Sequence, residues 1–165
     1  MSTPMHDQQL LDRTGKLLIE KQQTLAVAES VTSGHLQAAF SLAENARKFF
    51  QGGITVYNLG QKTRHLQVEP VHALACNCVS EKVAAEMASH VGQLFLSDWG
   101  IAITGYASPV PEKGIDRLFA CYAIYCNGRE LAREIIYSEA GEPEQVQLYY
   151  TQQVVKHLLR LLQSG

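Results

Sequence analysis

Ala28-Glu29-Ser30-Val31-Thr32-Ser33-Gly34 is the stretch that decides how this chain is organised. It follows the short apolar run 25–28 and precedes an amphipathic segment that begins near Gly34. This order is typical of a strand, a tight turn and the N-terminus of a helix. A serine in such a turn lies near unpaired backbone N–H groups and the positive end of a helix dipole, which suits an anion or an oxyanion. The alternative is a hydroxyl that only caps the helix, and this stretch alone leaves both interpretations open.

Strands and helices alternate along the rest of the chain. The apolar patterns predict strands at 24–28, 53–57, 99–104, 118–126 and 129–137, with Asn127-Gly128 as the turn of a hairpin between the last two. They predict helices at 8–22, 34–42, 59–66 after the capping Asn58, 70–75, 81–96 and 143–163. We therefore expect a single α/β domain over residues 1–165. Its fold would be an α/β/α sandwich with a mixed, largely parallel sheet that ends in an antiparallel hairpin.

Suggestive side chains stand at the ends of three predicted strands. Ser30 follows the first strand, Tyr57 ends the second and Thr104 ends the third. Open α/β sheets bind their ligands at the carboxyl ends of the strands, so this edge is the expected site.

Lys62 falls in the first turn or so of the helix that follows Tyr57. The positive end of the helix dipole destabilises a cation at this position and so lowers the pKa of the lysine. Burial would lower that pKa further. A neutral lysine can take the proton of a serine hydroxyl. To be mostly neutral near pH 7, its pKa must fall roughly three units below about 10.4, which requires about 4 kcal/mol. The alternative is a solvated surface lysine, the commonest setting for this residue.

Composition and motifs exclude several classes of function. With 46% hydrophobic residues, 18% charged residues and a net charge of −2, the chain offers no bulk attraction to nucleic acid or to an anionic membrane. No apolar run reaches the ~18 residues of a membrane span, and the polar segment 1–9 lacks a signal-peptide core, so we expect a cytoplasmic protein. The six histidines show no metal-ligand spacing, and the GxxxxGK[ST] and GxGxxG loops are missing. We expect all four cysteines to be reduced and structural.

Four motifs occur in a definite order: Ala28-Glu29-Ser30-x-Thr32-x-Gly34, Gly53-Ile54-Thr55-Val56-Tyr57-Asn58 with Lys62, Val79-Ser80-Glu81 and Ile103-Thr104-Gly105. With these motifs the chain resembles the carboxy-terminal domain of the competence/damage-inducible protein CinA, over about residues 8–163. Members of that family include nicotinamide mononucleotide amidohydrolases.

The resemblance implies a role for each matching residue. Ser30 would be the nucleophile, Lys62 its general base, and Tyr57 would orient the lysine or the serine hydroxyl. The substrate-binding region that the resemblance implies comprises Thr32, Ser33, Gly34, Thr104, Gly105 and Ser108. The implied substrate is a small nucleotide whose carboxamide loses ammonia, leaving nicotinate mononucleotide, and this chemistry needs no metal or organic cofactor.

The chain also departs from the family pattern. Val31 and Ser33 stand where the family usually has Cys and Gly. The stretch 105–112 replaces a glycine-rich Gly-x-Ala-Gly-Pro-type loop, with Ser108 in place of a glycine and prolines that stiffen the loop. Two functions therefore stay open at this point: an active amidohydrolase, or a non-catalytic relative that binds a nucleotide or a partner protein. A homodimer would fit the closed symmetry common among such domains.

Overall fold

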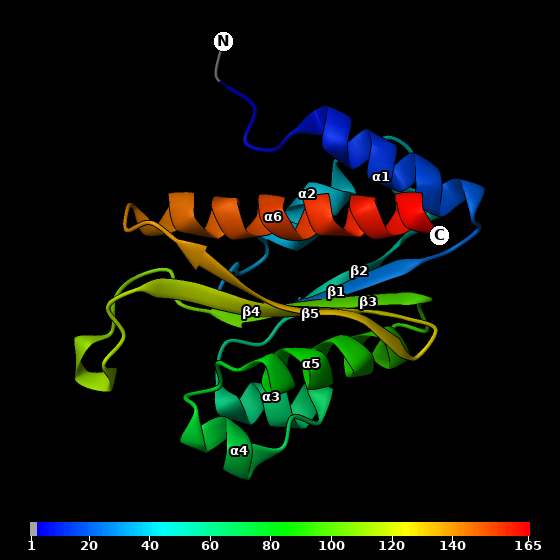
Figure 1. Ribbon diagram of the computed structural model, residues 1–165. Helices are drawn as coiled ribbons and strands as arrows, with labels where there is room; N and C mark the ends of the chain where they lie inside the picture. The colour runs from blue at the N-terminus through cyan, green and yellow to red at the C-terminus, as the bar shows by residue number, and fades with distance from the viewer. Residues whose placement is uncertain (1–2) are drawn as a thin grey trace.

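A five-stranded sheet forms the middle layer of the computed structural model, which describes residues 3–165 (Figure 1). The strand order is β2-β1-β3-β4-β5. The strands are β1 (Leu25–Glu29), β2 (Phe50–Thr55), β3 (Trp99–Gly105), β4 (Leu118–Cys126) and β5 (Arg129–Ser138). β1 pairs in parallel with β2 and β3, whereas β4 runs antiparallel to both β3 and β5. The predicted mixed sheet with a final hairpin is confirmed.

Helices cover both faces of this sheet (Figure 1). On one face lie α1 (Gln8–Glu20), α2 (His35–Ser41) and α6 (Pro143–Ser164). On the other face lie α3 (Leu59–Leu66), α4 (Pro70–Ala75) and α5 (Glu81–Leu94). Two short 3-10 turns, Ala46–Lys48 and Pro111–Lys113, complete the elements. The predicted single α/β domain with three layers therefore forms.

The central strand β1 explains why two cores form. All five of its residues are buried, and successive side chains point to opposite faces of the sheet. Leu25 and Val27 join the core beneath α1, α2 and α6. Ala26 and Ala28 join the core beneath α3, α4 and α5, where their small side chains pack with Met87 and other residues. Burial on both faces is typical of a parallel strand, which reads in sequence as a continuous apolar run.

The second strand lies earlier in the chain than predicted. We expected 53–57, whereas β2 spans Phe50–Thr55, because Gly52 lies inside the strand and does not mark the residue before its start. A Cβ at Gly53 would stand 2.7 Å from the carbonyl oxygen of Val27, so the strand approaches β1 where only glycine fits. Tyr57 consequently lies in the loop after β2, and the prediction that it ends a strand was wrong.

The other predicted elements differ from the observed ones by at most two residues at either end. The helix predicted at 81–96, for example, ends at Leu94, because Leu96 adopts a left-handed backbone with φ of 52°. Among residues 3–165, no helix combines the length and the hydropathy needed to cross a bilayer.

The register of the parallel strands brings their carboxyl ends to one place. Glu29, the last residue of β1, lies beside Thr55 of β2 on one side and Ile103 of β3 on the other. The segments that follow these three strands therefore meet at the same edge of the sheet.

Candidate active site

Ser30 and Lys62 meet at this edge. The Lys62 Nζ donates a hydrogen bond to Ser30 Oγ at 2.8 Å and a second one to the carbonyl oxygen of Val56 at 3.1 Å. Both side chains are buried, with exposed fractions of 6% for Ser30 and 1% for Lys62. The amine and the hydroxyl are therefore in contact across 32 positions of sequence.

The strand ends and a helix cap fix this pair. The Ser30 N–H donates to the carbonyl oxygen of Ile103 at 3.1 Å, which ties the turn after β1 to β3. The Val56 N–H donates to the carbonyl oxygen of Glu29 at 2.8 Å, which ties the loop after β2 to β1. Asn58 then caps α3 by accepting from the Gln61 N–H at 3.0 Å, so the predicted cap is confirmed. Lys62 follows one turn into α3 and reaches back to the turn.

Burial lowers the pKa of Lys62, and the nearby Cys78 thiol opposes only part of that effect. Burial likewise raises the pKa of Cys78. In the part of the chain that the structure describes, no carboxylate forms a salt bridge with Lys62. Burying an ammonium without an anionic partner costs free energy, so burial shifts the protonation equilibrium of Lys62 toward the neutral amine. The reasoning that made Lys62 a candidate base thus rests on its burial.

The turn after Ser30 is held by a buried carboxylate that we did not single out from the sequence. Glu29 is completely buried and accepts four hydrogen bonds. They come from the Thr32 hydroxyl at 2.6 Å, the Leu36 N–H at 2.8 Å, and the N–H and side-chain amide of Gln37 at 2.9 and 3.0 Å. Since the N-cap Gly34 has no side chain to offer, Glu29 satisfies the free N–H groups of α2 in its place.

Three predicted substrate-binding residues lie outside the pocket beside the Ser30–Lys62 pair. The Thr32 hydroxyl is engaged by Glu29, and Ser33 and Gly34 take left-handed backbone conformations, with φ of 45° and 106°, that lead the chain away into α2. The residues lining the pocket include Ser30 and Val31, but none of these three. Ser33, which stands where the family usually has glycine, therefore does not border this cavity.

The other predicted residues do border the pocket, which has a volume of about 470 Å³. Thr104 and Gly105, at the end of β3, and Ser108, in the following loop, line one wall. The Thr104 hydroxyl donates to the carbonyl oxygen of Cys78 at 2.8 Å, which joins two walls of the cavity. A Cβ at Gly105 would stand 2.6 Å from the Cα of Ala120, so only glycine fits there.

Tyr57 also lines the pocket, but its position does not fit the implied role of orienting Lys62 or the Ser30 hydroxyl. Its side chain is 69% exposed. Within residues 3–165 its hydroxyl makes no hydrogen bond to Ser30 or to Lys62, because the Lys62 amine is directed to Ser30 and Val56.

Sequence reasoning missed several residues of the lining, among them Leu74, Asn77, Cys78, Lys113 and Gln147. Cys78 directly precedes the Val79-Ser80-Glu81 motif. That motif could therefore have indicated that this segment forms part of the pocket wall. Gln147, in contrast, comes from α6 and donates its side-chain N–H to the carbonyl oxygen of Val31 at 2.8 Å, across 116 positions. No local sequence pattern predicts such a contact.

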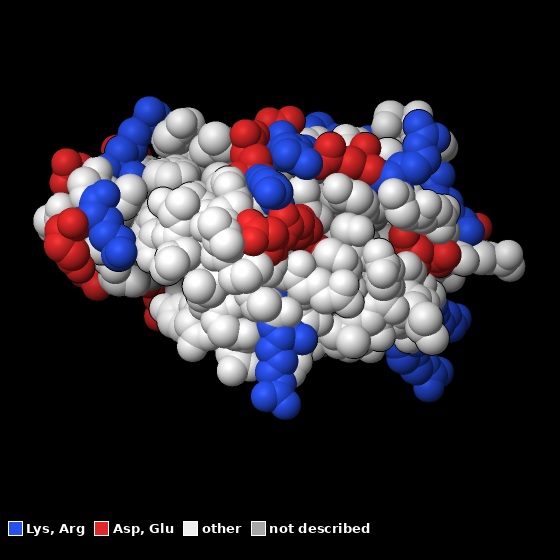
Figure 2. Space-filling view, turned by 90° about the horizontal axis from the view of Figure 1, so that it is seen from below, with Lys and Arg blue, Asp and Glu red and all other residues white. Residues whose placement is uncertain are grey.

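Two lysines, Lys62 and Lys113, line the pocket, and Lys113 is the one that remains a cation when burial favours neutral Lys62. Because no aspartate or glutamate faces the cavity in the described residues, its electrostatic character favours an anionic ligand. On the face that carries α3, α4 and α5, the Lys, Arg, Asp and Glu side chains gather mostly toward one side and the rim, and much of the surface is uncharged (Figure 2). This face offers no basic stripe of the kind that nucleic-acid binding requires.

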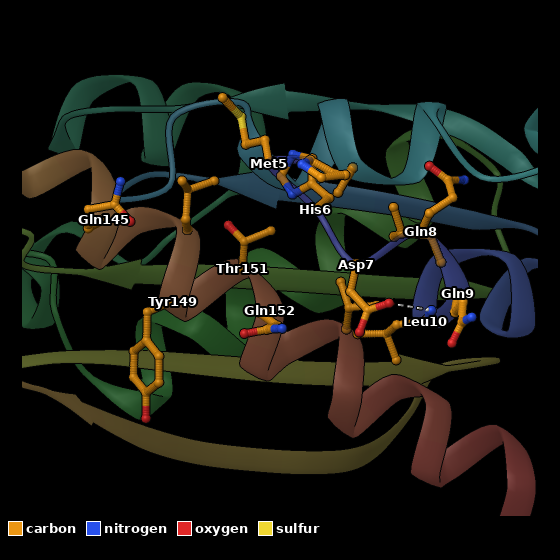
Figure 3. A pocket seen from close by; sticks show the side chains of 15 residues that line it. Met5, His6, Asp7, Gln8, Gln9, Leu10, Gln145, Tyr149, Thr151 and Gln152 are labelled. Atoms are coloured by element: carbon orange, nitrogen blue, oxygen red, sulfur yellow. Dashed lines mark hydrogen bonds between the residues drawn. The ribbon is translucent and has the colours of Figure 1, made fainter. Parts of the chain in front are cut away.

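A larger pocket, of about 590 Å³, lies between the N-terminal segment and α6 (Figure 3). His6, Gln8, Gln145, Tyr149 and Gln152 contribute most of its polar lining. Among residues 3–165 its lining includes no serine, cysteine or lysine, and its Asp7 caps α1 by accepting a hydrogen bond from the Leu10 N–H. Size alone would favour this cavity, but the hydrogen-bonded Ser30–Lys62 pair lies in the smaller one. No group of three or more His, Cys, Asp or Glu side chains suited to a metal ion occurs among the residues that the structure describes.

Comparisons with known proteins agree on one family. The family model described as the CinA C-terminal domain matches residues 7–162. A CinA-like protein of Synechocystis is 35% identical over 154 residues, covering 92% of this chain and 37% of the relative. A putative competence-damage inducible protein of Moorella thermoacetica is 35% identical over 162 residues, covering 96% of this chain and 38% of the relative. The chain thus spans less than two fifths of the length of these curated relatives.

Solved structures give the same result. A CinA superfamily protein from Klebsiella pneumoniae matches with a TM-score of 0.90 and 26% identity, over 99% of this chain and 100% of that one. A CinA superfamily protein from Escherichia coli matches with a TM-score of 0.86 and 30% identity, over 98% of this chain and 93% of that one.

Proposed function

This chain belongs to the CinA C-terminal domain family, and on that premise we propose that it is an amidohydrolase. Its substrate is the carboxamide of nicotinamide mononucleotide or of a related pyridine nucleotide, from which it releases ammonia. The observation that carries this proposal is the 2.8 Å contact between Lys62 Nζ and Ser30 Oγ in a pocket that favours anions.

The proposed reaction begins with proton transfer. Neutral Lys62 accepts the hydroxyl proton of Ser30 while Oγ attacks the carboxamide carbon, so that a tetrahedral oxyanion forms. The ammonium of Lys62 returns the proton to the departing nitrogen, which leaves as ammonia, and Ser30 keeps the acyl group as an ester. Lys62 then removes a proton from water, whose oxygen attacks the ester, and the proton returns to Ser30 Oγ. The balance is one amide and one water consumed, one carboxylic acid and one ammonia formed.

Two further features support this chemistry. The Val31 N–H, directly after the proposed nucleophile, has no acceptor among residues 3–165, so it is available to the oxyanion. Lys113, which also lines the pocket, supplies it with a cation. Because Lys62 must be neutral to act as a base, the negative charge of a substrate phosphate falls to Lys113.

The test is ammonia release from nicotinamide mononucleotide by the purified protein. Wild type should release ammonia, and Ser30→Ala and Lys62→Met should each lose at least about 10³-fold in kcat, since neither half of a nucleophile–base pair works alone. Ser41→Ala and Lys82→Met, at exposed positions on α2 and α5, are the matched controls. A wild-type protein that releases no ammonia but melts at a higher temperature with the nucleotide would refute the amidase and favour a binding module.

A further inference from the structure

Two large apolar side chains line the candidate active site and yet remain exposed. Tyr57, in the loop after β2, is 69% exposed, and Leu74, on α4, is 74% exposed. Single exposed apolar residues are common on protein surfaces and need no explanation. Two of them on the lining of one cavity form an apolar border that a ligand can cover.

The backbone on both sides of Tyr57 is fixed. On its N-terminal side, the Val56 N–H is bonded to the carbonyl oxygen of Glu29, and the Val56 carbonyl oxygen accepts from the Lys62 amine. On its C-terminal side, Asn58 caps α3. An exposed aromatic ring on such a backbone is preorganised for binding. The conformational entropy lost when a ligand binds comes mainly from the few rotatable bonds of the side chain.

The same contacts place Tyr57 next to the reacting groups. The carbonyl oxygen that precedes Tyr57 is 3.1 Å from Lys62 Nζ, and that amine is 2.8 Å from Ser30 Oγ. Because Tyr57 and Ser30 line the same cavity, a planar ring that covers the Tyr57 side chain lies in the pocket that contains Ser30. Within residues 3–165 the Tyr57 hydroxyl bonds to neither Ser30 nor Lys62, and the exposed ring is the larger surface that a ligand can cover.

We propose that Tyr57 and Leu74 form an apolar clamp for the planar heteroaromatic ring of the substrate. Tyr57 stacks on one face of the ring, and Leu74 contacts the ring from α4. The inference rests on the proposed function, since it is the carboxamide on this ring that meets Ser30. It replaces the lysine-orienting role that the resemblance implied for Tyr57, and it makes Tyr57 a determinant of substrate specificity.

The experiment compares two ligands on a Ser30→Ala background, where turnover does not disturb binding. Nicotinamide mononucleotide carries the pyridine ring, and ribose 5-phosphate lacks it. By titration calorimetry, Tyr57→Ala should weaken binding of the mononucleotide about tenfold or more, whereas the affinity for ribose 5-phosphate should not change. Tyr57→Phe, which keeps the ring, should restore tight binding, and Leu74→Ala should weaken it several-fold. Tyr149→Ala is the matched control, since Tyr149 is a 40% exposed tyrosine that does not border this pocket.

Other outcomes separate the clamp from the amidase. If the Phe variant binds the mononucleotide as poorly as the Ala variant, or if both lose kcat equally at an unchanged KM, the hydroxyl is the functional group and the clamp is overturned. A mononucleotide that fails to bind Ser30→Ala also overturns the clamp. If the mononucleotide binds and loses affinity in Tyr57→Ala, but wild type releases no ammonia, the clamp stands and the amidase fails.

Discussion

Replacing Glu29 by Gln should loosen the turn that presents Ser30. The substitution keeps the size of the side chain and removes its charge. One oxygen can still accept from the Thr32 hydroxyl and the Leu36 N–H, which bond to Oε1 at 2.6 and 2.8 Å. The new amide nitrogen, in contrast, faces the two Gln37 donors, which bond to Oε2 at 2.9 and 3.0 Å. Donors then oppose donors inside a completely buried site.

The size of the effect follows from these four bonds. A hydrogen bond to a charged group contributes about 1.5–3 kcal/mol, and a buried donor left unpaired costs about 1–3 kcal/mol. Relaxation at the half-buried Gln37 recovers part of the loss, so we expect about 2–3 kcal/mol less stability. For a domain of this size each kcal/mol lowers Tm by roughly 2–4 °C, which predicts a fall of about 4–12 °C.

Thermal and urea unfolding would measure this difference. Glu139→Gln, at an exposed position after β5, is the control for loss of one negative charge and should leave Tm within about 1 °C. The Glu29→Gln protein should also have a lower kcat at temperatures where it is fully folded, because the turn after β1 carries Ser30. A Tm equal to that of the control would show that the carboxylate does not hold the turn.

Two further predictions concern the lysines of the pocket. Because Lys62 acts when neutral, kcat/KM should rise with pH and level off above the Lys62 pKa, with a midpoint below the ordinary value of about 10.4, since burial lowers that pKa. Ammonia release measured between about pH 6 and pH 10 tests this, and a midpoint at or above the ordinary value would contradict it. Lys113→Met should raise KM about tenfold for nicotinamide mononucleotide but not for nicotinamide riboside, which lacks the phosphate. Equal effects on both substrates would remove Lys113 from phosphate binding.

Much of the fold could be predicted from the sequence because local patterns and tertiary burial agree. β1 reads as a short apolar run because it is covered on both faces, and Asn127-Gly128 marks a turn whose flanking strands do pair. β2 was placed wrongly because Gly52 and Gly53 resemble a boundary. In the folded chain, residue 53 must be glycine because the carbonyl oxygen of Val27 lies where a side chain would begin. This constraint comes from the neighbouring strand and not from the local sequence.

The site was predicted less completely than the fold. The meeting of Ser30 and Lys62 was foreseen from the motifs and from the edge of the sheet where they lie. The direction of the turn after Ser30 was not, since it depends on left-handed backbone at Ser33 and Gly34 and on the bonds that Glu29 accepts. Gln147 could not be found from local patterns, because only the packing of α6 brings it to the pocket.

The departures from the family pattern now separate into two groups. Ser33 lies outside the pocket and leaves its volume untouched, whereas Ser108 lines it in the loop between β3 and β4. Ser30 and Lys62 lie in segments that are hydrogen-bonded to buried strands and begin a capped helix, so substitutions in these segments disturb the core. The loop with Ser108 lies on the surface and can change at little cost in stability. Divergence in that loop alters how a ligand is held, and Val31, the departure that lines the pocket directly after Ser30, leaves Ser30 and Lys62 in contact. Altered specificity on retained chemistry is therefore the consequence that this arrangement favours.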